Sequence, residues 1–370
     1  MDTCDVVIVG GGPAGSTCAW RLRQAGSDVV VVDKAAFPRD KVCAGWITPQ
    51  VIDELRIDPD QYRHGRTWQP ITGFRVGVVG GDDVIETSYD RPVSFGIRRC
   101  EFDDYLLRRS GARLLLGAPV STIRRDGRGW IVNERVSAPM LVGAGGHFCP
   151  VARMLNGAPQ RASLVAAQEV EVLINHRASW IDGERPELYF CPDLEGYGWC
   201  FRKGDYVNIG LGRRDPHGLP RAIAQFVEFL KARRRVQMDA SWRWRGHAYL
   251  LSASRRRAVD EAVILVGDAA GLAYPQSGEG IRPAVESGLL AASTIVEANG
   301  HYSSDRLGPY TRRLQQRFGE GPFSQLLARV LPQRIPTVLA LRLLDTSWFV
   351  RQVVLDRWFL HAGEAALAGA

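Results

Sequence analysis

A glycine-rich turn between two short apolar runs constrains the fold of this chain more than any other feature. The first run is DVVIVG (Asp5–Gly10), and GGGPAG follows it. Pro13–Ala25 has helical spacing, Gly26 ends that helix, and DVVVVD (Asp28–Asp33) is a second apolar run. Strand, turn, helix and strand in this order predict a βαβ unit and therefore a parallel sheet.

The turn itself has the spacing of a dinucleotide-binding motif, Gly10-x-Gly12-x-x-Gly15, with Pro13 and Ala14 inside it. Such glycines permit a tight turn, a close approach of backbone to pyrophosphate, and packing of the helix on the strand. Asp33 ends the second strand about twenty residues later, where an acid commonly binds ribose hydroxyls. The motif predicts dinucleotide binding and leaves NAD and FAD open.

A second nucleotide-type element, far along the chain, favours FAD. The apolar run AVILV ends at Gly267-Asp268, and Pro275 and Gly278-Glu279-Gly280 precede a long helical stretch from Ile281. A carboxylate at a strand end can accept a hydrogen bond from a ribityl hydroxyl. The positive end of a helix can stabilise the negative charge of a reduced flavin.

The remaining patterns indicate a second domain. Residues 73–95 and 164–212 alternate apolar and polar side chains, which predicts an antiparallel sheet. We therefore expect an α/β fold with a doubly wound FAD-binding domain (1–70, 98–160 and 251–300). A substrate-binding sheet domain (71–97 and 161–250) is inserted into it, and a helical region (301–370) follows.

Composition excludes several classes of function. The net charge is +7, yet no nucleic-acid motif accompanies it. The seven cysteines include no C-x-x-C pair, so we expect neither a metal site nor a disulfide framework and favour a reducing cytoplasm. No uncharged run reaches the ~18 residues of a membrane-spanning helix.

One segment, YGWCFRKGD (Tyr197–Asp205), places an apolar wall on one face of a strand. Alternation puts Tyr197, Trp199, Phe201 and Lys203 on that face. Two interpretations stay open: these aromatic rings belong to the core of the sheet, or they form the wall of a pocket.

The chain resembles the FAD-dependent geranylgeranyl reductase family, within the flavoproteins folded like p-hydroxybenzoate hydroxylase. The resemblance lies in GGGPAG with the acid of VVVVDK, in FPRDKVCAGW (Phe37–Trp46), in RRCEFDDYL (Arg98–Leu106) and in GDAAGLAYPQSGEGI. YGWCFRKGDYVNIGLG is similar to the family's aromatic segment, with Arg202 where proline is usual.

This resemblance implies a set of site residues. FAD would contact Gly10, Gly12, Pro13, Ala14, Gly15, Asp33, Lys34, Arg39, Lys41, Cys43, Ala44, Arg99, Gly267, Asp268, Pro275, Gly278, Gly280 and Ile281. Tyr197, Trp199, Phe201 and Lys203 would line the substrate pocket, with Lys203 holding an anionic head group or ending the strand in solvent. Cys43, Tyr197 and Trp199 are the predicted catalytic residues; Cys43 would donate a proton or adjust the pocket, and an inert buried cysteine is the alternative.

The segment VGAGGHFCPVAR (Val142–Arg153) departs from the family pattern, because Gly145 stands where an aspartate is expected. That aspartate helps to place FAD and nicotinamide in relatives that use NAD(P)H. The electron source is therefore open between NAD(P)H and another reductant, such as an electron-donor protein.

The leading hypothesis is an FAD-dependent oxidoreductase that transfers hydride to a C=C bond of an apolar, isoprenoid-like or lipid substrate. One alternative is a flavin-dependent monooxygenase acting on an aromatic or polyketide-like substrate. Another is a flavoprotein that works on a partner protein or peptide. For the region Arg334–Leu360 we expect helices that cap the pocket, with peripheral membrane contact as the alternative.

Overall fold

The computed structural model describes residues 1–127, 129–157, 164–174, 181–233, 242–250, 256–319 and 337–367. Its first layer is a six-stranded sheet in the order β19-β20-β13-β2-β3-β9. All neighbouring strands are parallel except β19 and β20. The strands are β2 (Val6–Val9), β3 (Val29–Val32), β9 (Arg113–Leu115), β13 (Met140–Gly143), β19 (Val259–Asp260) and β20 (Val263–Leu265).

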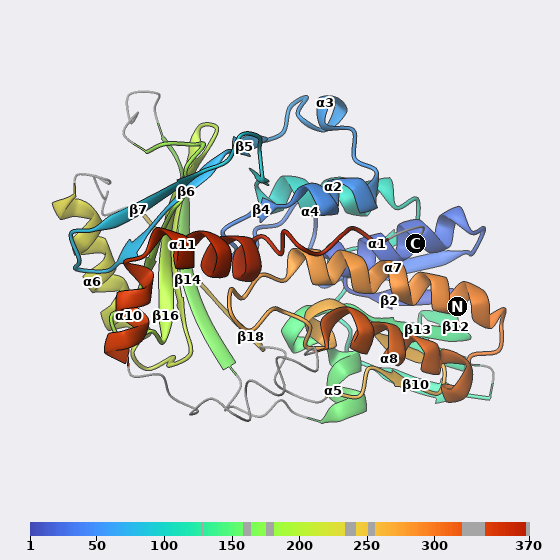
Figure 1. Cartoon of the computed structure of the whole chain (residues 1–370). Helices are drawn as coiled ribbons and strands as arrows, with labels where there is room; N and C mark the ends of the chain where they lie inside the picture. The colour runs from blue at the N-terminus through green and yellow to red at the C-terminus, as the bar shows by residue number, and fades with distance from the viewer. Residues whose placement is uncertain are drawn as a thin grey trace.

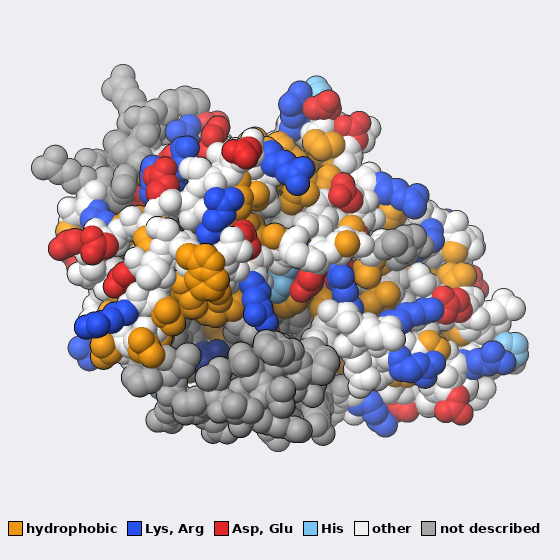
Figure 2. Space-filling model, in the orientation of Figure 1, with side chains coloured by type: hydrophobic (Ala, Val, Ile, Leu, Met, Phe, Trp, Pro, Cys, Tyr) orange, Lys and Arg blue, Asp and Glu red, His pale blue; other side chains and the backbone are white. Residues whose placement is uncertain are grey.

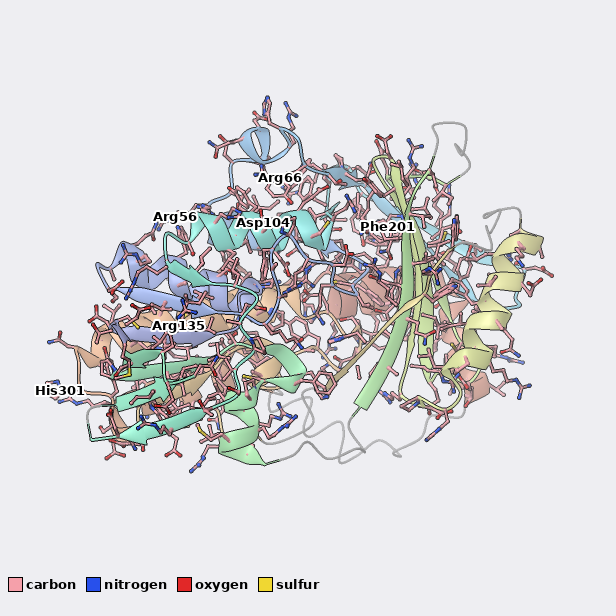
Figure 3. All side chains as sticks on the ribbon, turned by 180° about the vertical axis from the view of Figure 1, so that it is seen from behind. Arg56, Arg66, Asp104, Arg135, Phe201 and His301 are labelled. Carbon is pink, nitrogen blue, oxygen red and sulfur yellow. The ribbon has the colours of Figure 1, made fainter. Side chains whose placement is uncertain are left out.

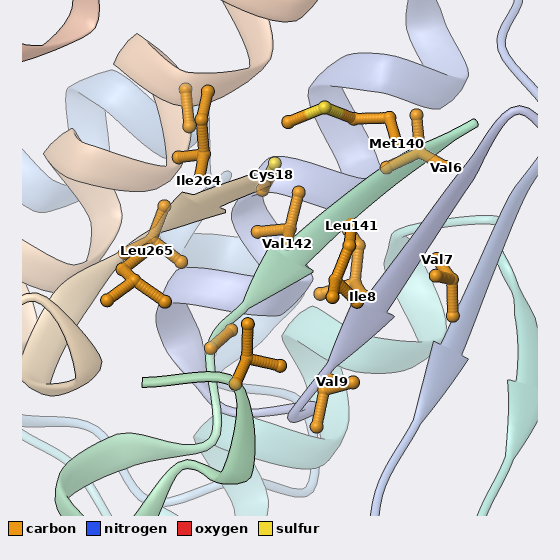
Figure 4. Close-up of a cluster of buried hydrophobic side chains, with 14 of the residues drawn as sticks. Val6, Val7, Ile8, Val9, Cys18, Met140, Leu141, Val142, Ile264 and Leu265 are labelled. Atoms are coloured by element: carbon orange, nitrogen blue, oxygen red, sulfur yellow. The ribbon is translucent and has the colours of Figure 1, made fainter. Parts of the chain in front are cut away.

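The central strands of this sheet are buried on both faces, which explains their uninterrupted apolar sequences. Figure 4 shows side chains of β2, β13 and β20 packed into one core with Cys18 of α1. The helices of this half are α1 (Pro13–Gln24), α4 (Arg99–Arg109), α7 (Ile281–Ala298) and α8 (Ser304–Phe318). A smaller sheet packs against β2 and β13: β1 (Asp2–Thr3), β12 (Val136–Ala138), β11 (Gly129–Val132) and β10 (Ile123–Asp126).

A seven-stranded sheet forms the second half of the molecule (Figure 1), in the order β18-β14-β17-β16-β15-β6-β7. Only the β15–β6 pair is parallel. Its strands come from two separate parts of the chain: β6 (Gly73–Val78), β7 (Val84–Ser88), β14 (Leu164–Leu173), β15 (Glu187–Phe190), β16 (Gly196–Lys203), β17 (Tyr206–Arg213) and β18 (Arg245–Leu250). Helix α6 (Leu219–Ala232) covers the face to which Cys200 and Ile209 point.

Shorter elements join the two halves. Strands β4 (Trp46–Ile47), β5 (Gln69–Ile71) and β8 (Ser94–Gly96) form a third sheet beside α2 (Pro49–Leu55) and α3 (Pro59–Tyr62). The 3-10 turn η1 (Gly146–Phe148) precedes α5 (Pro150–Asn156), and η3 (Gly267–Ala269) follows β20. At the C-terminal end, α10 (Thr337–Leu344), α11 (Ser347–Phe349) and the π-helical η4 (Val350–Phe359) cross the front of Figure 1.

The predicted fold class is confirmed: a doubly wound nucleotide-binding half, an inserted antiparallel sheet in two pieces, and a helical C-terminal region. Two details differ from the expectation. Residues 94–96 pair with β4 and β5 and not with the large sheet, and α8 packs on α7 and β19 of the nucleotide-binding half. Residues 334–336 of the predicted capping region lie outside the described residues.

Candidate functional site

A cavity of about 370 Å³ lies where the parallel sheet meets the large antiparallel sheet. The turn after β2, the loop after β3, the end of β13, the turn η3 and the start of α7 contribute to its wall. Most residues predicted from the sequence line it: Gly12, Pro13, Ala14, Asp33, Lys34, Arg39, Lys41, Cys43, Ala44, Arg99, Tyr197, Trp199, Asp268, Gly278, Gly280 and Ile281. Gly10, Gly15, Gly267, Pro275, Phe201 and Lys203 do not.

The three glycines of the first motif have two different roles. Close backbone contacts require glycine at Gly10 and Gly15, whereas Gly12 borders the cavity. Gly10 has φ +114°, and a Cβ there would lie 2.3 Å from the carbonyl oxygen of Ala144. A Cβ on Gly15 would lie 1.9 Å from the oxygen of Gly10. A Cβ on Gly12 would meet only the Arg39 side chain, at 3.5 Å, so the space above Gly12 is open toward the cavity.

The start of helix α1 offers backbone donors to this space. Gly12 is the N-cap of α1 and gives no side-chain cap, so the first N–H groups of the helix are available to an anion. Asp33 lies beside them and accepts hydrogen bonds from the amides of Gly11 (2.7 Å) and Ala35 (2.8 Å). Those two bonds fix the carboxylate at the cavity wall, where a ribose would meet it.

The second motif brings another helix start to the same cavity, where Glu279 accepts a hydrogen bond from the Arg282 amide (2.9 Å). Gly280 is the N-cap of α7 and also has no side-chain cap. The turn before α7, which contains Pro275, is closed by a hydrogen bond from the Gly278 amide to the Tyr274 carbonyl (2.8 Å). A Cβ on Gly280 would lie 3.1 Å from Asp268 Oδ1, so glycine lets this carboxylate approach the helix start.

These features fit FAD. Two helix N-termini can take the pyrophosphate and the electron-rich edge of the flavin. The Nη1 atom of Arg39 lines the same space, is buried, and has no hydrogen-bond partner among the described residues. A buried guanidinium donor without a partner is costly, and a cofactor oxygen would satisfy it.

Two arginines, Arg39 and Arg99, and the thiol of Cys43 line the cavity. Arg99 is buried and donates to both oxygens of Asp103 at 2.8 Å, and Arg39 Nη2 lies 3.1 Å from the same carboxylate. The guanidinium of Arg99 also hydrogen-bonds the Cys43 side chain. Asp103 therefore holds two arginines in place, one at the cofactor end and one at the thiol.

Lys41 pairs with a residue that the sequence did not single out, His247 of β18. Its Nζ contacts His247 Nε2, and both side chains line the cavity. Burial lowers the pKa of Lys41 to about 8. Burial and the charge of Lys41 lower the pKa of His247 to about 3, so this histidine is neutral at physiological pH. The short strand RGHAYL carried no motif that could have revealed it.

The far end of the cavity has an aromatic wall. Tyr197 and Trp199 face it from β16, and Trp46 joins them from the start of β4. Trp199 donates its Nε1–H to Asn208 Oδ1 (2.6 Å), and the Tyr197 hydroxyl bonds the Ser277 carbonyl. These bonds fix both side chains. Trp46 was not predicted, although it belongs to the quoted FPRDKVCAGW segment.

The interpretation of Phe201 and Lys203 as pocket residues was wrong. Both are on the predicted face of β16, and Figure 3 shows Phe201 between the sheet and the nucleotide-binding half. Phe201 packs on Trp46, with ring centroids 5.9 Å apart, behind the cavity wall. Lys203 is fully buried; its Nζ lies 2.5 Å from Glu171 and donates to the carbonyls of Ala44 (2.9 Å) and Ile97 (3.1 Å). It neither reaches solvent nor faces the cavity.

The segment Val142–Arg153, which differs from the family pattern at Gly145, also borders the cavity. Gly145 and His147 line it, and a Cβ on Gly145 would lie only 3.2–3.3 Å from Cys149. The Nδ1 atom of His147 is buried without a partner among the described residues.

No group of three metal-binding side chains occurs in the part of the chain that the structure describes. Within the same part, no helix combines the length and apolar character that crossing a membrane requires.

Comparisons with known proteins identify relatives among FAD-dependent oxidoreductases. The family model for FAD-dependent oxidoreductases matches residues 5–71. The menaquinone reductase of Mycobacterium tuberculosis is 30% identical over 383 residues, covering 94% of this chain and 89% of the relative. The digeranylgeranylglycerophospholipid reductase of Methanocaldococcus jannaschii is 26% identical, covering 90% and 88%.

Solved structures show the same fold. A geranylgeranyl bacteriochlorophyll reductase-like protein from Thermoplasma acidophilum superposes with a TM-score of 0.80 at 21% identity, covering 98% of this chain and 95% of that one. A flavin-dependent brominase has a TM-score of 0.71 at 18% identity, covering 97% and 92%. With a cavity that fits FAD and 30% identity across nearly its whole length, the chain belongs to the geranylgeranyl reductase family of FAD-dependent oxidoreductases.

Proposed function

We propose that this oxidoreductase saturates carbon–carbon double bonds of an isoprenoid chain carried by a quinone or a lipid. One observation supports it above all: the starts of α1 and α7, the Cys43 side chain and an aromatic wall all line a single cavity. The names of the relatives point the same way, because menaquinone and the digeranylgeranyl lipids both carry such chains.

Different residues would bind the substrate, donate the proton and stabilise the thiolate in this reaction. Bound FAD in its reduced form supplies a hydride. The rings of Tyr197, Trp199 and Trp46 offer an apolar, rigid surface against which an isoprenoid chain loses water. Cys43 gives its thiol proton to the second carbon of the double bond. The guanidinium of Arg99, held by Asp103, stabilises the thiolate that remains.

The test is a single-turnover reaction under nitrogen. Protein whose flavin has been reduced with dithionite is mixed with menaquinone or with a digeranylgeranyl phospholipid. We expect the flavin absorbance to return as the product, measured after any quinol has been reoxidised to the quinone in air, gains two mass units for each saturated bond. If the flavin stays reduced with both substrates and turns over only when oxygen is admitted, the monooxygenase hypothesis replaces this one.

We also propose that electrons reach the flavin from a donor other than free NAD(P)H. Gly145 supplies no carboxylate, and the close Cys149 leaves little room for a longer side chain at this position. Flavin reduction by NADH or NADPH should therefore be slower than reduction by a protein donor such as a ferredoxin. Rapid reduction by either nucleotide, at the rate of turnover, would contradict this proposal.

We further propose that the C-terminal helices touch the membrane that holds the substrate. Val338, Leu339 and Trp348 are 67%, 53% and 69% exposed. Figure 2 shows hydrophobic side chains gathered beside α10 and α11, with Lys or Arg side chains around them. Apolar side chains flanked by arginines suit an anionic lipid surface. Trp348→Ser should weaken co-sedimentation with phosphatidylglycerol vesicles, and unchanged co-sedimentation would refute the contact.

A further inference from the structure

Glu169 is a buried carboxyl that the proposed reaction has not used. It lies on β14, is 7% exposed, and accepts hydrogen bonds from the backbone amide of Cys43 and from Asn208 Nδ2 (3.4 Å). Asn208 in turn accepts from the indole of Trp199 (2.6 Å). One polar network thus joins Glu169 to the loop of the thiol and to the aromatic wall.

A second, polar cavity of about 840 Å³ adjoins this carboxyl. Cys43 and Glu169 both line it, and Cys43 lines the FAD cavity as well. Leu173 and Arg245, the latter paired with Glu169 in the β14–β18 register, also border the polar cavity, and their side chains are 67% and 61% exposed. Water can therefore reach Glu169 and the Cys43 loop without passing through the space for FAD and the apolar substrate.

The surroundings of Glu169 favour a carboxyl that can change its proton near neutral pH. Burial raises its pKa to about 7; Lys203 and the Cys43 amide oppose that rise, and Glu171 adds to it. Its neighbour Glu171 differs, because Lys203 (2.5 Å) and Arg98 (2.9 Å) hold it ionised. The other charged or titratable groups that border the polar cavity are Asp40, Lys41, Arg99, Cys100, Arg243, Arg245 and His247.

We propose that Glu169 is a positioning residue that returns a proton to Cys43 after each reduction, using water in the polar cavity. This inference rests on the proposed function. The thiol of Cys43 gives H⁺ to the substrate carbon and becomes a thiolate. The Glu169 carboxyl passes its proton through water to that thiolate and becomes a carboxylate. The carboxylate then takes one proton from solvent, and Glu169 transfers no electrons. This route supplies one of the two protons that saturation of a double bond requires, and the other enters with the two electrons that reduce the flavin again.

This division predicts different effects on the first and later turnovers. Glu169→Gln keeps the shape and the acceptor for the Cys43 amide but has no acidic proton. With excess dithionite, the first turnover should stay within twofold of wild type, while later turnovers slow by about tenfold or more. The wild-type steady rate should fall as pH rises through about 7, and Glu169→Gln should lose that fall. Glu171→Gln, which changes the neighbouring carboxylate, should keep it.

A second measurement does not depend on turnover. Infrared difference spectra of the FAD-loaded protein should show a protonated carboxyl band that disappears as pH rises through about 7, and Glu169→Gln should lack that band. A wild-type spectrum without it would overturn the inference, as would a Glu169→Gln enzyme with unchanged later turnovers. If no isoprenoid is reduced at all, the proposed function fails, while the infrared titration still decides whether Glu169 holds the proton. Glu169→Asp provides a carboxyl-bearing variant if the glutamine protein does not fold.

Discussion

At the scale of single residues, the two glycines of the first turn have separable roles. Gly12 adopts φ −73°, which any residue can adopt, and a Cβ there meets only Arg39 at 3.5 Å. We expect Gly12→Ala to change the stability of the apoprotein by less than about 1 kcal/mol. The added methyl group fills the space for the pyrophosphate, so FAD affinity should fall about tenfold or more, or about 1.4 kcal/mol. Fluorescence titration with FAD and thermal unfolding measure the two effects.

Gly10→Ala is the matched control for that experiment. Its φ of +114° and the 2.3 Å approach to the Ala144 oxygen predict a loss of more than about 2 kcal/mol in unfolding free energy. If both variants lost stability equally while Gly12→Ala kept wild-type FAD affinity, the assignment of Gly12 to the pyrophosphate would be wrong.

Lys203 shows what a sequence pattern leaves undetermined at this scale. Alternation correctly predicted the face of β16 on which Lys203 lies. It could not predict that the loop of Ala44 and the strand end at Ile97 cover that side chain and accept two hydrogen bonds from it. Parity along a strand follows from backbone geometry, whereas burial depends on segments more than one hundred residues away.

At the scale of elements, the pairing of β16 with β17 sets the aromatic wall. Trp199 lies opposite Gly210 in the register, and a Cβ on Gly210 would be 2.2 Å from the indole ring. Gly210→Ala must therefore displace Trp199, at a cost of about 1–3 kcal/mol in unfolding free energy. We expect FAD to remain bound and the KM for the apolar substrate to change severalfold.

Gly246, a glycine of the same sheet on strand β18, supplies the control for Gly210→Ala. Gly246 of β18 has no atom closer than 3.6 Å to the position of an added Cβ, so Gly246→Ala should leave KM and the unfolding temperature near wild type. An unchanged KM in Gly210→Ala would mean that Trp199 does not contact the substrate.

The elements that sequence reasoning predicted are those with a strong local signal. The βαβ start, the helix from Ile281 and the alternating strands each follow from apolar spacing and turn residues. Strand β18 and His247 were missed because six residues, RGHAYL, have no distinctive alternation. Trp46 and Glu169 were missed because their roles depend on contacts between segments far apart in the sequence. Trp46 meets the aromatic wall of β16, and Glu169 of β14 meets the loop of Cys43.

At the scale of the whole molecule, the C-terminal segment fastens the two halves together. Val350, Val354 and Phe359 of η4 join the core beneath the large sheet. The following residues bind the nucleotide-binding half through Arg282 of α7, which donates to the carbonyls of His361 (3.2 Å) and Glu364 (2.8 Å). Helical spacing predicted helices here, but no local pattern indicated which surface they would join.

The same junction predicts how stability depends on pH. Glu54 of α2 accepts a hydrogen bond from the Leu367 amide (3.0 Å), and its burial, aided by the nearby charge of Glu286, raises its pKa well above the usual range. In the unfolded chain an ordinary glutamate loses its proton above about pH 4.3. The folded state therefore binds more protons than the unfolded state from that pH up to the raised pKa. Within this window the free energy of unfolding falls as pH rises, by at most about 1.4 kcal/mol per pH unit for this group.

Glu54→Gln removes the titrating group while its amide oxygen can still accept from Leu367. Urea unfolding at pH 5, 6, 7 and 8 should therefore show a flatter decline in stability for Glu54→Gln than for wild type. Glu169 contributes a decline of the same sign, so some dependence on pH should persist in Glu54→Gln and shrink further in the variant that also carries Glu169→Gln. Parallel curves for wild type and Glu54→Gln would show that the junction of α2, α7 and the C-terminal segment does not hold a protonated carboxyl. The attachment of this segment would then depend on Arg282 and the apolar contacts of η4, and stability near neutral pH would be set elsewhere in the molecule.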